Sequence, residues 1–481
     1  MNSDLAPRAG ILRTAFSRSM KGSDVCMSDV QTVPAKAPLF TKKALIRLII
    51  PLVIEQFLLM TVGMADTVMV TSSGEAAVSG VSLVDNINNL LIQIFAALAT
   101  GGTVIVSQYL GNQDLSSARK AAKQLLYTVT AVSSALMALA LIFRQHILSL
   151  VFGSIEPTVM HSALDYFLST ALAYPFMAVY NAGSALFRAM GNSKVSMFNS
   201  LIVNIVNITV NAILIYGFGM GALGAGIGTL VSRIVAAVVI LVLLQKKTNA
   251  LRIPKLFRPE LHFGMVKRIL ALGIPNGLEN GLFQVGKLLV LSLITSFGTN
   301  AVAANAIANS VAGVINVPGQ ATGLALITVV GQCMGAKEPE QAVSYTKKLM
   351  AVTYVTMGVM CLTLFLIAGP LVTIFNLSPQ SADMAAEVLR WCAIFTMLFW
   401  PLAFTLPNSL RAAGDVVFTM TVSLLSMFIF RIGFSYLLGA DWGLGLHLLG
   451  VWIAMFIDWI VRDAAFVIRF LQGKWKSLQV I

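Results

Sequence analysis

Carboxylates within a long apolar segment near the N-terminus are the first residues whose chemistry calls for an explanation. Asp66 lies in VGMADTVMV, and Glu55 precedes it by eleven residues, about three helical turns, so both face the same side of a helix. A carboxylate at this depth in an apolar helix can bind H⁺ or Na⁺, or pair with a cationic substrate. A structural ion pair is the alternative for each. We predict ion coupling at Asp66, Glu55 and Glu279, with Na⁺ near Asp66 as one option.

A second apolar segment carries a polar cluster. Asp85 and Asn89 lie one turn apart, with Asn86 and Asn88 beside them. Residues four apart share a helix face. The cluster could contact a substrate, or it could hold neighbouring helices together through hydrogen bonds.

Three amides recur at helical spacing in a third segment. Asn204, Asn207 and Asn211 are three and four residues apart, so they share one face. Their carbonyl oxygens could coordinate a substrate or an ion, or they could bond to neighbouring helices.

The second half of the chain has its own charged segment, with Glu279, Gln284 and Lys287. A buried lysine needs a partner, and a carboxylate of the first half is the natural candidate. We hypothesise that this pair forms and breaks with protonation, a permanent structural pair being the alternative. Asp458 and Arg462, four residues apart, can neutralise each other. For Arg188 and Arg411 a position at a helix end suffices as a reason.

The elements that position these residues must be membrane-spanning helices. The chain is 57% hydrophobic and 11% charged, with a mean hydropathy of +0.83, whereas soluble domains carry about 25% charge. Its apolar runs are continuous and long enough for the bilayer core, which favours helices over a barrel. We predict twelve spans, at about residues 45–70, 77–109, 121–143, 163–187, 195–216, 222–245, 268–297, 300–333, 346–368, 384–410, 417–439 and 445–470.

The net charge of +13 follows the topology of these spans. The segment 246–268 alone holds seven Lys and Arg, whereas the segments predicted outside hold only Arg144 and Arg390. This asymmetry fits the positive-inside rule and argues against a nucleic-acid partner. Both termini are therefore predicted to be cytoplasmic. Residues 1–40 read as a flexible tail without a signal peptide, and a start at Met20 or Met27 would remove most of it.

The two halves repeat each other. One constant shift of the numbering, which we call the repeat shift, places Glu55 on Glu279, Gln108 on Gln332 and Asp85 on Asn309, with Asn305 one turn before. We predict an all-α membrane protein of two six-helix lobes, residues 41–245 and 265–472, related by a pseudo-two-fold axis along the membrane normal. Residues 246–264 form a basic cytoplasmic linker and 473–481 a C-terminal tail. Parallel repeats recur in transporters, with the substrate between the halves.

The predicted cavity combines the polar residues of both halves. It comprises Asp85, Asn89, Asn204, Asn207, Asn211, Gln284, Lys287, Asn305 and Asn309.

Other classes of function lack their sequence signals. The four cysteines form no CxxC and the four histidines are scattered, so neither a metal site nor a cofactor is predicted. There is no Walker A motif, which excludes a self-contained ATPase, and no HExxH or paired-Asp motif for an intramembrane enzyme. A channel does not need two lobes. A flippase for a lipid-linked precursor remains the main alternative, and its cavity would be more strongly cationic.

The chain resembles the multidrug and toxic compound extrusion (MATE) transporters over about residues 40–470. The motifs are PLVIEQ and ADTVMV, SQYLGNQD and FRAMGNSKV, repeated in the second half as PNGLEN, GQCMGAKEP and LRAAGDV. The resemblance implies a V-shaped bundle with a central cavity, in a bacterial cytoplasmic membrane, which exports cationic or aromatic compounds in exchange for H⁺ or Na⁺. We expect a monomer.

The resemblance also bears on single residues. Asp66 matches the family's ion-coupling Asp, and Gln284 lies closer than Glu279 to the acidic position of the sodium-coupled branch. Asn211 stands where some members carry an acid, and no carboxylate lies near Trp400, where that branch has another. Coupling therefore depends more on Asp66, and the ion stays open.

Overall fold

The computed structural model describes residues 37–481 except 154–155, 254–255, 257, 259 and 376. The described residues contain helices, turns and loops, and residues 39–481 form one compact unit. Nearly all of the predicted tail, including the alternative starts, lies outside the described residues.

The first half contains the helices of the first six predicted spans. They are α1 (Lys42–Thr71), α2 (Glu75–Gly111), α3 (Leu115–Phe152), α4 (Pro157–Leu172), α5 (Tyr174–Ala189), α6 (Ser193–Asn211) with the π-helical turn η1 (Ala212–Gly217), and α7 (Gly221–Leu244). The break between α4 and α5 falls at Ala173, immediately before a segment with proline in its first turn. Proline is tolerated there because the first N–H groups of a helix have no internal partner.

The second half repeats this order with more interruptions. It contains α8 (Phe263–Thr295), α9 (Thr299–Gly335), α10 (Pro339–Thr373), α11 (Pro379–Leu398), η2 (Pro401–Thr405), α12 (Pro407–Ala413), α13 (Val416–Ser426), η3 (Met427–Gly433), α14 (Phe434–Gly439), α15 (His447–Gln472) and η4 (Lys474–Ser477).

Among the described residues, nine helices are long and apolar enough to cross a membrane, or ten if the pair bent by 58° at α11–α12 is one span. The other two predicted spans correspond to α4–α5 and α15. The first consists of two helices of 16 residues each, and the second carries Asp458, Arg462 and Asp463 along its length. The first of these spans is thus divided into helices that are short, and the second carries more charge than a purely apolar span.

The duplication is visible in the backbone. Gly74 and Gly298 precede α2 and α9 with φ angles of 94° and 92°. Gln113 and Lys337, which follow the same two helices, have φ angles of 59° and 58°. Non-glycine residues rarely adopt positive φ. Two turns with nearly the same unusual geometry, at positions that the repeat shift superposes, indicate that each half keeps one ancestral loop design.

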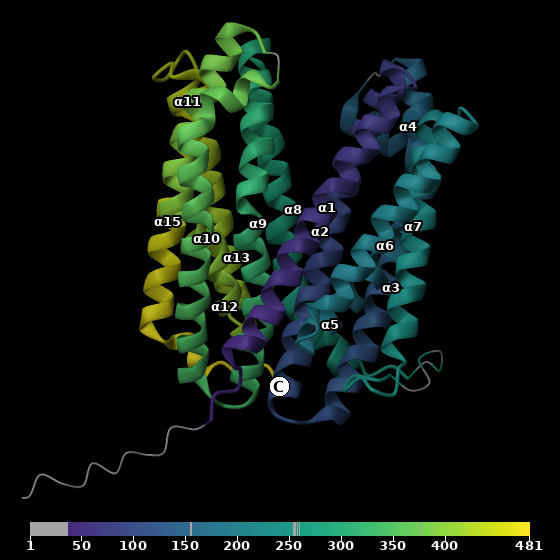
Figure 1. Cartoon of the computed structure of the whole chain (residues 1–481), viewed down its shortest axis with the longest axis vertical. Helices are drawn as coiled ribbons and strands as arrows, with labels where there is room; N and C mark the ends of the chain where they lie inside the picture. Colours follow the sequence, from purple (N-terminus) through teal and green to yellow (C-terminus); the bar gives the residue numbers. More distant parts are fainter. Residues whose placement is uncertain (1–36, 154–155, 254–255, 257, 259, 376) are drawn as a thin grey trace, which may run out of the picture. The chain divides into compact units, whose positions relative to one another are not determined.

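The two halves lie side by side and meet along α1, α2, α8 and α9 (Figure 1). One hydrophobic cluster fills the first half around Phe95, Phe167 and Phe187. Another fills the second half around Phe456 and Trp459. A third joins the beginning of α1 to α9, α10, α12 and α15, so that first-half side chains are buried among second-half helices. The halves are thus bound to each other by apolar packing at the end where α1 begins.

Helices α2 and α9 cross at this end through twin contacts. A Cβ on Gly111 would overlap the carbonyl group of Gln332, and a Cβ on Gly335 would overlap that of Gln108. We call these four residues the α2–α9 crossing. Only glycine lets the backbones approach this closely. Both contacts exist because the repeat places the same glycine and glutamine on each helix.

The glutamines of the crossing also reach into the opposite half. The Nε2 of Gln108 donates to the carbonyl oxygen of Ala412 at 2.9 Å, and the Nε2 of Gln332 donates to that of Ala189 at 2.7 Å. These carbonyls lie at the ends of α12 and α5, where helix carbonyls lack internal partners. Each half therefore caps a helix of the other.

The segment between the halves is fastened to α3. Lys123 pairs with Glu260 at 3.1 Å, and the hydroxyl of Tyr127 donates to the carbonyl of Leu256. The side chain of Leu251 is buried. Up to the start of α8, the described part of this linker is thus held against the first half.

Candidate functional site

Polar side chains gather at one place in each half. The first-half site consists of Asp66, Asp85, Asn88, Asn207 and Asn211. The second-half pocket is a cavity of about 540 Å³ between α8, α9, α11, η2, η3 and α15.

Asp66 is held by the amides of α6. Its Oδ1 accepts a hydrogen bond from Nδ2 of Asn211 at 2.5 Å, and that nitrogen lies 3.4 Å from Oδ1 of Asn207. Asp66 is only 7% exposed. The spacing of the asparagines placed them on one face, and the structure brings that face to Asp66. A buried carboxylate and two amides now share one site.

Gly228 on α7 makes room for this arrangement. A Cβ there would overlap the Oδ1 of Asn211. Oδ1 of Asn211 is buried and has no hydrogen-bond partner among the described residues. The carboxamide is thus fixed by a donor bond to Asp66 and keeps an acceptor that could serve an ion.

Asp85 forms the other part of the first-half site. It accepts from the hydroxyl of Tyr166 at 2.9 Å and from Asn88 at 3.5 Å, and the hydroxyl of Tyr174 donates to Asn88 at 2.9 Å. Asn89, which the sequence placed in the cavity, is exposed. Consecutive helix residues point about 100° apart, so the inward position belongs to Asn88. Asn89 lies outside the first-half site and stays a predicted cavity residue.

The charges at this site are unbalanced. The negative charges of Asp66 and Asp85 repel each other, and Arg233 on α7 acts on Asp66 in the opposite sense. The guanidinium of Arg233 lies 5.9 Å from the ring centre of Tyr180, and its Nε has no hydrogen-bond partner among the described residues. Two neighbouring carboxylates, of which Arg233 acts on Asp66 alone, can accept a further positive charge.

Glu55 lies in a different environment from Asp66. Both face α6, as the eleven-residue spacing predicts. However, Glu55 pairs with Arg188 at 3.1 Å and accepts from the hydroxyl of Ser196 at 2.6 Å. Its side chain is 1% exposed. A carboxylate so buried and neutralised belongs to the packing of α1, α5 and α6, which separates it from the ion site.

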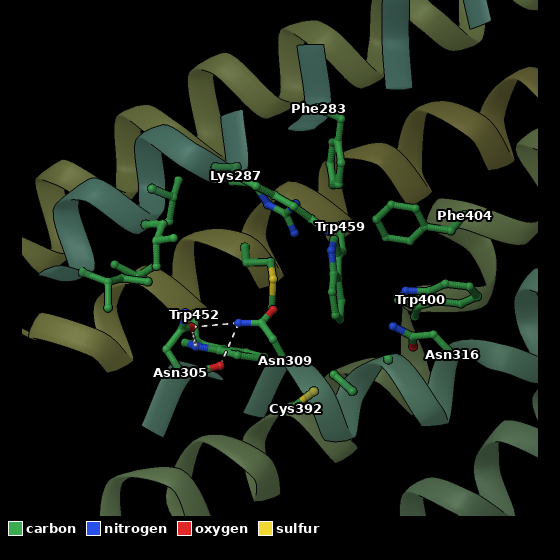
Figure 2. Close-up of a pocket in the computed structure, with 18 of the residues that line it drawn as sticks. Phe283, Lys287, Asn305, Asn309, Asn316, Cys392, Trp400, Phe404, Trp452 and Trp459 are labelled. Atoms are coloured by element: carbon green, nitrogen blue, oxygen red, sulfur yellow. Dashed lines mark hydrogen bonds between the residues drawn. The ribbon is translucent and has the colours of Figure 1, made fainter. Parts of the chain in front are cut away.

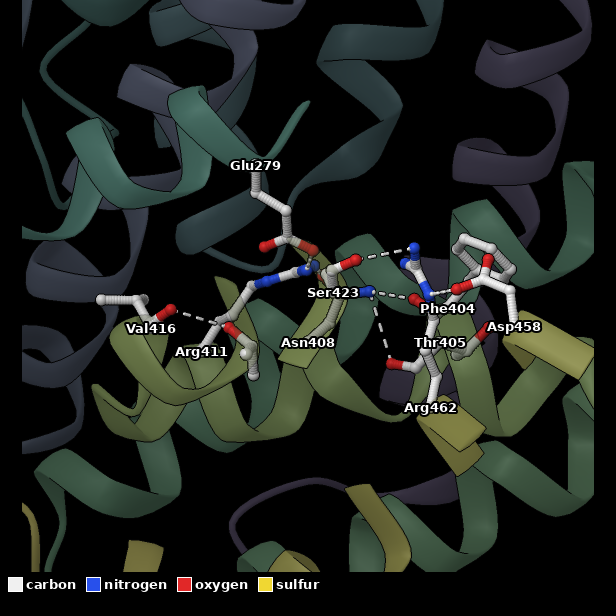
Figure 3. A network of polar contacts seen from close by, with 10 residues as sticks. Glu279, Phe404, Thr405, Asn408, Arg411, Val416, Ser423, Asp458 and Arg462 are labelled. Atoms are coloured by element: carbon white, nitrogen blue, oxygen red, sulfur yellow. Dashed lines mark hydrogen bonds and ion pairs between the residues drawn. The ribbon is translucent and has the colours of Figure 1, made fainter. Parts of the chain in front are cut away.

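The second half repeats this ion pair. Glu279 pairs with Arg411 at 2.6 Å, and Arg411 also donates to Asn408 at 3.1 Å (Figure 3). Helix-end position was therefore an incomplete reason for Arg188 and Arg411, because each neutralises a buried glutamate. A carboxylate in the apolar interior needs such a partner.

Lys287 is not paired with a described carboxylate of the first half, so the hypothesised pair is not formed in this structure. It forms no ion pair among the described residues, and its ammonium lies 5.4 Å from the ring centre of Phe283. Glu279, on the same helix, forms its ion pair with Arg411. Gln284 is not among the residues that line the pocket. Lys287 points instead into the second-half pocket (Figure 2).

Aromatic and amide side chains stand out in the pocket wall (Figure 2). The aromatic lining residues are Phe283, Trp400, Phe404, Trp452 and Trp459, and the amides are Asn305, Asn309, Asn316 and Gln320. Lys287 and Arg431 supply the charges. The aromatic residues were not predicted, because tryptophan and phenylalanine are equally common on lipid-facing surfaces. Asn305 and Asn309 were predicted and do line the cavity.

Three cations lie close to one aromatic ring of the pocket wall. The charges of Arg431, Arg462 and Lys287 lie 4.8, 5.3 and 5.4 Å from the ring centre of Phe283. Asp458 is 2.8 Å from Arg462, as the spacing predicted (Figure 3). It is also 3.5 Å from Arg431. Asp458 is thus the ion-pair partner of both arginines. An aromatic face attracts cations within about 6 Å and helps to hold them together.

The remaining predicted amide, Asn204, belongs to helix packing. Its Nδ2 donates to the carbonyl oxygens of Leu58 at 3.1 Å and Ser200 at 2.9 Å. It therefore ties α6 to α1 at a distance of about one turn from Asn207.

Comparison with known proteins identifies the family. The MatE family model matches residues 51–213 and again residues 275–437. The two matches cover more than half of the chain, and the repeat shift places the start of the first on the start of the second. This chain belongs to the MATE family. The MATE assignment confirms the resemblance, the all-helical two-repeat fold and the prediction that the protein is a transporter and no enzyme.

Relatives and solved MATE structures match nearly the full length. The chain is 28% identical to the probable multidrug resistance protein NorM of Thermotoga maritima, over 92% of this chain and 94% of that protein. It is 27% identical to the uncharacterized transporter YisQ of Bacillus subtilis, with 88% and 93% covered. An outward-facing multidrug resistance MATE transporter superposes with a TM-score of 0.82 at 20% identity, covering 91% and 96% of the two chains.

Proposed function

We propose that this MATE protein is a secondary active antiporter, which exports small organic compounds in exchange for H⁺ or Na⁺ by alternating access. The observation that carries the proposal is the buried carboxylate of Asp66, bonded to an amide and beside a second carboxylate. Intramembrane carboxylates of this kind commonly carry protons or ions in transporters.

The first-half site suits a small cation. A proton or Na⁺ at Asp66 would offset the repulsion between Asp66 and Asp85. The amide oxygen of Asn211, free of a hydrogen bond among the described residues, could become a ligand for Na⁺. Oxygen ligands are those that hard cations prefer.

The second-half pocket suits an organic compound. Its volume of about 540 Å³ lies within the range of about 300–1,000 Å³ that drug-sized ligands occupy. Its aromatic walls can stack on a ring system. A cationic compound, which the family resemblance implies, would instead find its counter-charge at Asp66 and Asp85. Ion and cargo would then bind in different halves or compete at the first.

The distribution of Lys and Arg supports a multi-pass protein of the bacterial cytoplasmic membrane with both termini inside. In this orientation the α2–α9 crossing closes the cytoplasmic end. A single chain supplies both halves, so we propose a monomer.

A flippase for a lipid-linked precursor remains the second candidate. The positive charges of Lys287 and Arg431 favour it, because such precursors carry phosphate groups. A gradient requirement distinguishes the two functions.

The test uses purified protein in proteoliposomes. Asp66→Asn should abolish dye export driven by an imposed H⁺ or Na⁺ gradient, whereas Asp441→Asn, the same change at a carboxylate that is 88% exposed, should leave it intact. The gradient that drives export in the parent protein identifies the ion. Normal export by the Asp66 variant would remove this residue from coupling, and transport that persists without any gradient would refute antiport.

A further inference from the structure

The second-half pocket carries more positive charge than the protein neutralises. Lys287 and Arg431 line it, and Arg462 lies beside it. Asp458 accepts a hydrogen bond from Arg462 and lies 3.5 Å from Arg431. No acidic residue lines the pocket among the described residues, and Lys287 forms no ion pair there.

The positive charge of Lys287 must be compensated. A lysine in the middle of an apolar helix is costly unless a counter-charge or water compensates it. Contact with Phe283 supplies part of the compensation, but a ring quadrupole is weaker than a carboxylate. The side chain of Lys287 is exposed and no described protein residue pairs with it, so its charge is open to water and to the negative group of a ligand.

The duplication shows that the two halves have opposite polarity at matching places. The repeat shift places Asp66 on Val290, which lines the pocket, and Asp85 on Asn309, which also does. The same shift places Gly63 on Lys287. Both carboxylates of the first-half site are thus replaced by uncharged side chains, and a cation is added. The second half cannot repeat the ion site of the first.

The rest of the wall fits a flat ring. Trp400 and Phe404 stack with ring centres 5.2 Å apart, and Trp459 stands edge-on to Phe404 at 6.0 Å. Figure 2 shows these three rings on one side of the cavity, with Lys287 beside them. Gly319 on α9 allows this position of Trp400, because a Cβ would overlap its ring.

We propose that the second-half pocket binds aromatic organic anions, with a carboxylate, sulfonate or phosphate group at Lys287 and Arg431 and the ring against Trp400, Phe404 and Trp459. The anion supplies the counter-charge that Lys287 lacks. That such anions are the exported cargo rests on the proposed function. That they bind in the pocket does not, because binding needs no gradient.

The binding test compares two dyes that share a three-ring xanthene skeleton and differ in charge, fluorescein (anionic) and rhodamine 123 (cationic). Fluorescence anisotropy with the purified full-length protein should show tighter binding of fluorescein. Lys287→Gln should weaken that binding by about tenfold or more, the loss typical of a hydrogen bond to a charged group. Lys287→Arg should restore most of it.

Lys267→Gln is the matched control, because it removes the same charge from the same helix. Lys267 is twenty residues from Lys287, about 30 Å along α8. It should bind fluorescein as the parent does. Equal fluorescein affinity for Lys287→Gln and the parent, with all variants folded by circular dichroism, would overturn the proposal, and so would tighter binding of rhodamine 123 that depends on Lys287.

Farnesyl pyrophosphate distinguishes the sources of the anion. Competition with fluorescein would identify a lipid phosphate as a ligand, whereas failure to compete would restrict the pocket to soluble anions, and either supports an anion site. Transport separates this inference from antiport. Gradient-driven export of rhodamine 123 without fluorescein would refute the anionic cargo and leave antiport standing. Lys287-dependent fluorescein binding without any gradient-driven export would support the anion site and refute antiport.

Discussion

A methyl group added at the α2–α9 crossing should open the end of the molecule that the crossing closes. The Cβ of Gly111→Ala would overlap the carbonyl oxygen of Gln332 and lie 2.7 Å from its carbonyl carbon, whereas ordinary contact begins at 3.4 Å, so the helices must separate by more than about 0.7 Å. Overpacking of this kind costs about 1–3 kcal/mol. The strain acts on the closed state alone, which shifts the equilibrium towards the open state by about 5- to 150-fold.

Thiol labelling measures this shift. Ser107 on α2 is fully buried against Gly331 of α9. In a chain whose four native cysteines are replaced by alanine, Ser107→Cys should react slowly with a maleimide. Adding Gly111→Ala should raise the labelling rate by about 5- to 150-fold, the shift in the equilibrium towards the open state. Gly335→Ala should raise it equally, since the two contacts are copies of each other.

Gly277→Ala is the control. It adds a methyl group to α8 where α8 faces α2, and its Cβ would lie 3.7 Å from that of Ala97, an ordinary contact. Labelling should then match the parent. If Gly111→Ala and Gly335→Ala fold normally and also label at the parental rate, the crossing does not hold the closed state and the reasoning fails.

Two further predictions concern the first half. Glu55→Gln should lower the free energy of unfolding by about 3–5 kcal/mol, because it leaves the charge of Arg188 without its partner. The double variant with Arg188→Met should recover most of this loss, measured by thermal denaturation in detergent. Equal losses in the single and double variants would exclude a paired role. Gly228→Ala should displace the carboxamide of Asn211 from Asp66 and weaken ion coupling by about tenfold or more, measured as the ion concentration for half-maximal export. An unchanged ion dependence in a folded Gly228→Ala protein would contradict that role.

Helical periodicity predicted much of the first-half site. Asn207 and Asn211 came from their four-residue spacing, and Asp66 came from its depth in an apolar run. Periodicity does not decide between adjacent residues of a polar cluster, where Asn88 is buried at the first-half site and Asn89 is exposed. A difference of one residue rotates a side chain by about 100°.

Contacts between distant segments could not be predicted. Arg188 meets Glu55 across 133 residues of sequence, and a single sequence offers no signal for such a pair. The π-helical segments are a further obstacle, since the extra residue in each turn changes which side chains face inward. Arg431 lies in one of them, η3, and its place at the pocket does not follow from a regular helical period.

The reciprocal contact at the α2–α9 crossing bears on how the protein arose. Each helix offers a glycine to the partner's glutamine and a glutamine to the partner's glycine. Before the duplication, one six-helix chain would have carried both on a single surface, and two copies of such a surface fit together as an isologous dimer. Joining two such copies in one chain would make the pairing permanent and let each copy change separately. One half could keep acids while the other gained bases, a division of labour that two identical subunits could never reach.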